Sequence, residues 1–220
     1  MRKRSKILVV VIALAFIFTG VQAEALDTVV GETEVRLEAE RENIRTRETT
    51  LGNLIADMMK DKTDADVAMT NGGGIRHSVP AGEITLEDVL EIHPFENTIV
   101  SIELTGQEII DALEHGVSQF PDHWGGFLHV SGLRYTFNPL NEPGERIHQV
   151  FYEGELIDPE ATFEVATNDF LAEGGDDFEI FAEKVAINTD VGIHEALIDY
   201  LDKHSPVSPR VEGRIYGTVK

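Results

Sequence analysis

The chain has 220 residues, a length that suits one well-packed domain and is marginal for two. It carries 18 Lys and Arg against 40 Asp and Glu, which gives a formal net charge of −22 at pH 7. Such a charge repels nucleic-acid backbones and anionic membrane surfaces and argues against both as partners. The absence of cysteine excludes disulfides, a cysteine nucleophile and a lipid anchor attached through cysteine.

The first 23 residues have the pattern of a secretory signal peptide. A basic start, residues 1–6, precedes an almost wholly apolar run over residues 7–19, and Val21-Gln22-Ala23 resembles a cleavage site. A permanent membrane anchor is the alternative, but this apolar run is short for a bilayer that needs about 20 residues. We therefore expect cleavage near Ala23, export to a periplasm, cell wall or medium, no stable membrane anchor, and a domain comprising residues 24–220.

Helical spacing of apolar residues recurs along this domain. A helix ending near Lys62 is predicted by apolar residues at i, i+3, i+4, i+7 and i+8: Leu51, Leu54, Ile55, Met58 and Met59. Thr85 is placed to cap a short helix through Leu90, and Thr105 with Glu108 forms a capping-box pattern that opens another helix. A last helix is predicted by the stripe Ile193, Leu197, Ile198 and Leu201.

Strands are predicted between these helices, where alternation or β-rich composition occurs. The expected strands cover residues 66–70, 98–104, 133–137, 147–152, 162–167 and 214–217. No internal repeat, low-complexity tract or Pro- and Ser-rich linker divides the chain. The predicted fold class is therefore α+β, a single domain in which a mixed β-sheet is packed by helices.

A search for catalytic motifs finds none. The eight histidines form neither H-E-x-x-H nor the D-x-H and N-H-E runs that hold paired metals, and no G-x-S-x-G elbow exists. The triple glycine at residues 72–74 continues as Ile75-Arg76-His77, which fits neither a Walker loop nor a dinucleotide fingerprint. We expect no catalytic residue, no metal ligand and no cofactor in this chain. Catalysis by Asp176, Asp177 and a histidine lacks any supporting spacing.

Four segments are too polar and glycine-rich to be core, and each offers groups that suit a small polar ligand. They are Ile44-Arg45-Thr46-Arg47-Glu48 with the following Leu51-Gly52-Asn53-Leu54, N-G-G-G-I-R at 71–76, P-F-E-N at 94–97, and N-D-F-L-A-E-G-G-D-D-F at 168–178. In this order they resemble the signature of the 5′-nucleotidase C-terminal domain over residues 28–217. The pair N-G-G-G-I-R and F-L-A-x-G-G-D is the most specific part of that resemblance.

The resemblance implies a substrate-binding site. Phe95 and Phe170 would sandwich a nucleobase, because a flat apolar ring gains most between two others. Asn71, beside Gly73, would bond a base edge, and Asp176 would accept from the ribose hydroxyls. The guanidinium groups of Arg45 and Arg76 would face the ribose–phosphate end of the ligand. The alternatives are core aromatics and surface ion pairs. Asp177 departs from the family pattern and would add repulsion near a phosphate.

The resemblance also implies a second component. Enzymes of this family carry an N-terminal metallophosphoesterase domain with two metal ions, for which this chain has no room. Two hypotheses follow. The chain binds a nucleotide or nucleoside outside the cytoplasm and contributes to phosphate-ester hydrolysis with a separately encoded metallophosphoesterase, or it is an autonomous, non-catalytic binding and scavenging module or a degenerate remnant.

Overall fold

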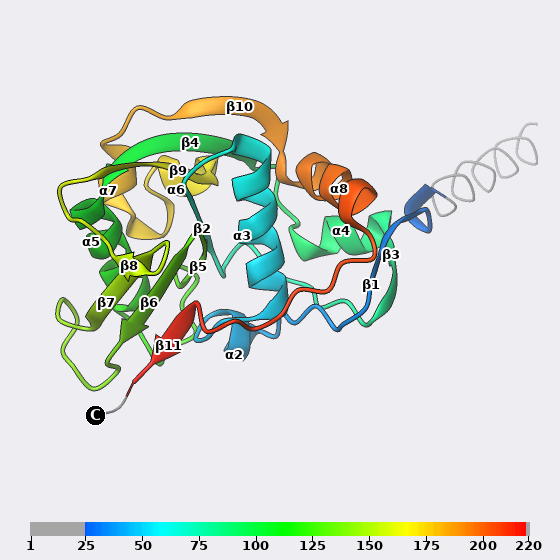
Figure 1. Cartoon of the computed structure of the whole chain (residues 1–220). Coiled ribbons are helices and arrows are strands. Elements are labelled where there is room, and N and C mark those ends of the chain that lie inside the picture. The colour runs from blue at the N-terminus through cyan, green and yellow to red at the C-terminus, as the bar shows by residue number, and fades with distance from the viewer. Residues whose placement is uncertain (1–24, 219–220) are drawn as a thin grey trace, which may run out of the picture.

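A five-stranded sheet forms the centre of the molecule (Figure 1). The computed structural model describes residues 25–218. The sheet order is β10-β4-β9-β2-β5, in which β2 and β9 run parallel and the other neighbours are antiparallel. The strands are β2 (Val67–Asn71), β4 (Thr98–Thr105), β5 (Leu128–Ser131), β9 (Thr162–Asn168) and β10 (Ile187–Gly192). The sheet is therefore mixed, as the sequence predicts.

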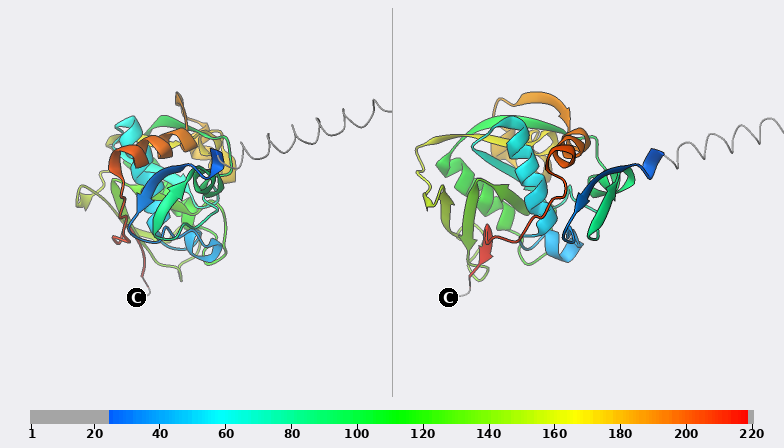
Figure 2. Two further views of the ribbon diagram at one scale, coloured as in Figure 1. Left: turned by 90° about the vertical axis from the view of Figure 1, so that its right-hand side faces the viewer. Right: turned by 45° about the vertical axis from the view of Figure 1, so that its right-hand side comes forward.

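Two smaller sheets lie at opposite sides of this centre (Figure 2). One has the order β11-β6-β7-β8, with β11 parallel to β6, and the other pairs β1 with β3. Their strands are β11 (Ile215–Gly217), β6 (Leu133–Phe137), β7 (Ile147–Tyr152), β8 (Glu155–Leu156), β1 (Val29–Thr33) and β3 (Gly82–Thr85). The three sheets are thus distributed along the molecule, with the central sheet between the other two.

Four longer helices and several short ones complete the fold. The longer ones are α3 (Thr50–Thr63), α4 (Leu86–Ile92), α5 (Gly106–Val117) and α8 (Ile193–His204). The short ones are α2 (Arg41–Ile44), α6 (Asp169–Ala172), α7 (Glu179–Ala182) and the 3₁₀ turn η1 (Gly175–Asp177). Complete capping boxes open α4 and α5, because the hydroxyl and backbone of each cap residue bond the third helical residue. Within residues 25–218 no helix has the length and apolar character of a membrane span.

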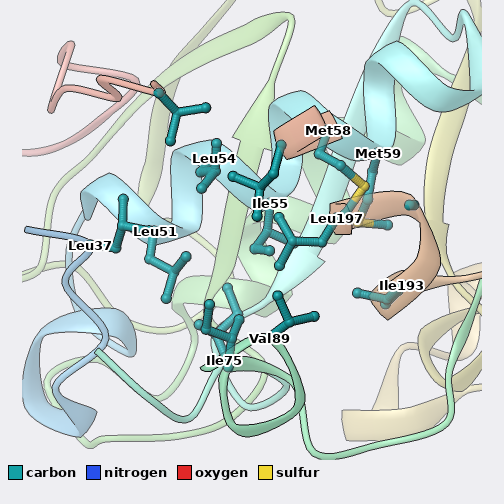
Figure 3. Close-up of a cluster of buried hydrophobic side chains, with 14 of the residues drawn as sticks. Leu37, Leu51, Leu54, Ile55, Met58, Met59, Ile75, Val89, Ile193 and Leu197 are labelled. Carbon is teal, nitrogen blue, oxygen red and sulfur yellow. The ribbon is translucent and has the colours of Figure 1, made fainter. Parts of the chain in front are cut away.

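The central sheet is buried on both faces, except at its edge strand β10. Alternation along β2 sends Ala68 into one apolar cluster and Val67 and Met69 into the other. The first cluster packs α3, α4 and α8 together, and Figure 3 shows its side chains around Ile55 and Leu197. The second joins α5 to the β6–β7 sheet. Helices and a second sheet therefore cover the strands, which makes the strand ends rigid supports for loops.

The predicted fold class and the predicted helices and strands are confirmed. Each predicted helix has an observed counterpart, although the helix expected through Leu90 continues to Ile92. Each predicted strand is also present within one residue of the expected bounds. The sequence did not predict β1, β3, β5, β8 or β10. The predicted signal peptide lies outside the described residues.

Candidate functional site

A cavity of about 700 Å³ opens beside the carboxyl ends of the parallel strands β2 and β9. Loops that follow strands at such an edge commonly form ligand sites in sheet proteins. Twelve residues line the cavity, and all seven residues predicted from the sequence are among them: Arg45, Asn71, Gly73, Gly74, Arg76, Pro94, Phe95, Glu96, Asn97, Gly125, Phe170 and Asp176. Five separate segments therefore converge on one space.

Buried amides at the ends of β2 and β9 hold the carboxylate of Asp176. Asn71 donates from Nδ2 to Asp176 Oδ2 at 2.7 Å, and Asn168 donates from Nδ2 to Asn71 Oδ1 at 3.2 Å. Asp176 itself adopts the left-handed conformation, with φ 51° and ψ 34°, and its carbonyl is 2.9 Å from the His115 ring nitrogen. The carboxylate is thus fixed in place before any ligand arrives.

The glycine run brings three backbones close together. Gly73 N donates to Gly125 O at 2.8 Å, so the end of β2 is bonded to the loop before β5. A Cβ atom on Gly72 would lie 2.2 Å from the carbonyl oxygen of Ile44, well inside any real contact distance. Only glycine permits this approach, which places Arg45, directly after α2, beside Asn71.

Phe95 and Phe170 are exposed rings at the cavity. Phe95 is 40% exposed and Phe170 is 43% exposed. The other phenylalanines of the same region are almost completely buried: Phe127, Phe178 and Phe181. Neither Phe95 nor Phe170 is therefore an ordinary core aromatic. Since exposure of an apolar ring is unfavourable, two such rings at one cavity make this surface a candidate for ligand contact.

Phe95 is supported from below by a buried histidine. The His93 ring meets the Phe95 ring edge-on, with centroids 5.7 Å apart, and the guanidinium of Arg76 lies 5.3 Å from the Phe95 centroid. Burial lowers the pKa of His93 to about 4, against the weaker opposing effect of its contact with the Phe95 carbonyl. His93 is therefore neutral at pH 7 and adds no charge below the ring.

Two arginines, Arg45 and Arg76, bring positive charge to the cavity. Arg45 is only 7% exposed and donates from Nη1 to His123 O at 3.1 Å. Burial, followed by repulsion from Arg41 and Arg76, lowers its pKa, and Asp176 opposes this shift. An arginine stays protonated in proteins, so the charge remains. Neither Arg45 nor Arg76 forms an ion pair with a carboxylate in the described part of the chain, unlike Arg47.

The structure adds residues that the sequence did not single out. Gly74, Pro94, Glu96 and Asn97 line the cavity within segments already selected, but Gly125 comes from a loop that was not. The only available signal is the Gly125-Gly126 pair after the single tryptophan. Asp177 is exposed and does not line the cavity, and the repulsion expected from it stays a prediction. Over residues 25–218 no group of three or more His, Asp or Glu is arranged to hold a metal ion.

Two exposed aromatic rings, two arginines and a carboxylate held by Asn71 thus converge on one cavity, which is the candidate ligand site of this α+β domain. A family model described as 5′-nucleotidase, C-terminal domain matches residues 29–183. The chain belongs to this family, as its motifs predict.

Two curated relatives show how much of a longer protein the chain represents. It is 43% identical over 198 residues to the trifunctional nucleotide phosphoesterase protein YfkN of Bacillus subtilis, covering 84% of this chain and 14% of that protein. It is 34% identical over 187 residues to protein UshA of Escherichia coli, covering 84% of this chain and 33% of that protein. The chain thus spans a third or less of these relatives.

Solved structures agree with the fold. The 5′-nucleotidase precursor from Thermus thermophilus superposes with a TM-score of 0.87 at 40% identity, over 94% of this chain and 43% of that one. The NAD nucleotidase NadN of Haemophilus influenzae gives 0.80 at 21% identity, over 94% of this chain and 41% of that one. The second likeness concerns the fold alone.

Proposed function

We propose that this domain recognises a nucleotide or nucleoside in the 700 Å³ cavity and contributes to the hydrolysis of its phosphate ester. The observation that carries the proposal is that half-exposed Phe95 and Phe170 share one cavity with Arg45, Arg76 and Asp176. An aromatic base, a polar sugar and an anionic phosphate require these three kinds of group. Few other small ligands combine all three.

Each group has a role in this proposal. Phe95 and Phe170 stack on the base. Such stacking accepts any base, because every base has an aromatic face. Asn71 lies beside Gly73 and has two hydrogens on Nδ2. One forms the hydrogen bond to Asp176, and the other is available to the ligand. The Asp176 carboxylate keeps further lone pairs for ribose hydroxyls. The guanidinium groups neutralise the phosphate in an otherwise acidic protein.

Hydrolysis requires a partner in this proposal. The chain covers 14% of a curated relative named as a nucleotide phosphoesterase. The parts of that relative outside the match are therefore long enough to hold a catalytic domain. We infer that a metallophosphoesterase domain, separately encoded, supplies the divalent metals and activates water, while this domain holds the substrate. Export, directed by residues 1–23, would place the reaction outside the cytoplasm.

A second candidate is autonomous binding without catalysis. Five segments of the chain form the cavity together, and the Asn71–Asp176 hydrogen bond holds one of its polar groups in place. Such a preorganised site suits a scavenging module. The two candidates differ in whether a partner is needed for phosphate release, and not in which ligand is bound.

The test is calorimetric titration of the purified protein with adenosine and AMP. We expect binding of both, and Phe170→Ala should weaken it by about 5- to 150-fold because stacking on an aromatic ring contributes roughly 1–3 kcal/mol. Phe151→Ala is the matched control, since Phe151 is a partly exposed ring outside the cavity. Absence of binding at millimolar ligand, or equal loss in the control variant, would contradict the proposal.

A phosphate-release assay with added divalent metal separates the two candidates. AMP hydrolysis that appears only when a metallophosphoesterase is added supports the joint reaction. Binding that no such partner converts into phosphate release supports the scavenging module.

A further inference from the structure

Asp169 lies between the two segments that carry the exposed phenylalanines. It is the first residue of α6 and directly precedes Phe170. Its Oδ1 accepts from Asn97 Nδ2 at 2.7 Å and from Phe170 N at 2.8 Å. Its Oδ2 accepts from Thr98 N at 3.1 Å and from Thr98 Oγ1 at 2.9 Å. One carboxylate therefore bonds both segments, with all four donors satisfied by a group that only accepts.

The hydrogen bonds of Asp169 lie beyond the last paired residues of β4 and β9. In the ladder between β4 and β9, the final pair is Ile99 with Asn168. Both phenylalanines lie outside this ladder: Phe95 is in the connection between α4 and β4, and Phe170 is in α6. Strand pairing alone therefore does not fix the separation of the two rings. The bonds of Asp169 to residues on both sides supply that constraint, because they join Asn97 and Thr98 to the backbone of Phe170 itself.

Asp169 also determines which atom of Asn97 is free. A carboxylate cannot donate, so the Asn97 amide must turn Nδ2 toward Asp169. Its carbonyl Oδ1 is then the end left for the cavity, which Asn97 lines. The neighbouring Glu96 carboxylate lines the same wall and is likewise an acceptor. The hydrogen bonds accepted by Asp169 thus fix both the position of this wall and the orientation of its Asn97 amide.

We propose that Asp169 is a positioning residue that sets the width of the slot between Phe95 and Phe170 and the orientation of the Asn97 amide. The proposal rests on the proposed function for the nature of the ligand. The link between the segments is a property of the chain and is testable without ligand.

The experiment compares ¹⁵N-labelled wild-type protein with Asp169→Asn by NMR. The substitution would place an NH₂ group where the carboxylate now accepts hydrogen bonds from backbone N–H groups. We therefore expect hydrogen exchange of the Thr98 and Phe170 backbone amides to accelerate at least tenfold. The Val165 amide, in the middle of β9, should keep its wild-type rate. Affinities for adenosine and AMP, from chemical-shift titration, should both fall about tenfold, and their ratio should stay constant because the arginines are untouched.

Two further variants separate positioning from general damage. Asp66→Asn removes a carboxylate that accepts from Glu164 N at 2.9 Å at the opposite end of β9, and it should leave both affinities unchanged. In the double variant Asn97→Asp with Asp169→Asn, the amide at position 169 donates to the carboxylate at position 97 and its oxygen still accepts from Thr98, so only the Phe170 N–H loses its acceptor. The double variant should bind adenosine more tightly than either single variant, which is the signature of direct coupling.

The outcomes are distinguishable. Unchanged exchange of the Thr98 and Phe170 amides in Asp169→Asn would overturn the inference whether or not a ligand binds. Unchanged affinity in Asp169→Asn, where the wild type binds, would also overturn it and leave the proposed function intact. If the wild type bound neither ligand, the proposed function would be wrong and the amide exchange rates alone would decide whether the link exists.

Discussion

At the scale of single residues, Arg45 and Arg47 form a natural comparison. Arg45 is 7% exposed and lines the cavity, whereas the Arg47 side chain is 57% exposed and pairs with Glu38 at 2.9 Å. Hydrogen bonds to a charged group contribute roughly 1.5–3 kcal/mol, so Arg45→Gln should weaken AMP binding by about ten- to a hundredfold. Adenosine, which has no phosphate, should lose little affinity.

The control for this prediction is Arg47→Gln, which should leave both ligands unaffected because a surface pair contributes little. Calorimetry with AMP and adenosine in parallel makes the measurement. An equal loss of affinity for both ligands in Arg45→Gln would show that Arg45 supports the fold of the cavity and not the phosphate.

Sequence reasoning located most of the cavity at this scale. Arg45, Asn71 and Phe170 belong to short polar segments that make poor core, and the segments are recognisable without knowing their separation in space. Gly125 was not predictable, because it reaches the cavity only through a backbone bond to Gly73. Asp176 and Asp177 both adopt left-handed backbone conformations, and only Asp176 lines the cavity, a difference that the sequence did not show.

At the scale of elements, side-chain alternation made some strands predictable but was not required, since β2 is buried at every position and was predicted. β6 shows buried and exposed residues in turn, and the period was visible in the sequence. β5 is buried at every position, so it has no alternation to detect. β10 is mostly exposed, and its pairing with β4 is interrupted near Asp190, which has φ 58°. Edge strands of this kind depend on their neighbours more than on their own composition.

Glu48 provides the prediction that belongs to this scale. Its buried carboxylate accepts from the backbone nitrogens of Glu212, Gly213 and Arg214 at 2.7, 2.9 and 2.8 Å, and so fastens the segment that leads into β11. Glu48→Gln places an amide donor among these donors. The free energy of unfolding should fall by roughly 2 kcal/mol.

Urea unfolding measures this change, and hydrogen exchange should locate it at residues 212–215. Glu155→Gln, an exposed carboxylate on β8, is the control and should change stability by less than about 0.5 kcal/mol. Faster exchange throughout the central sheet, with no preference for the segment before β11, would argue against a local fastening role.

At the scale of the whole molecule, two buried histidines connect stability to pH. His129 is fully buried, with Nε2 2.8 Å from Ile44 O, and burial lowers its pKa to about 4. His93 has the same lowered pKa for the same reason. Both lie where the central sheet meets the cavity loops, so protonation of either would disturb fold and site together.

The sign of the effect follows from proton binding. Between pH 6.5 and about 4 the unfolded chain protonates these histidines and the folded chain does not, so the free energy of unfolding falls as pH falls. Each histidine contributes a slope of about 1.4 kcal/mol per pH unit in that window. His129→Gln should reduce the slope by about one such increment, and the exposed His148→Gln should not. Urea midpoints between about pH 4.5 and 6.5 give the slopes. If His129→Gln lowers stability equally at every pH in that window, His129 acts through packing alone, and the acid sensitivity of the fold arises elsewhere.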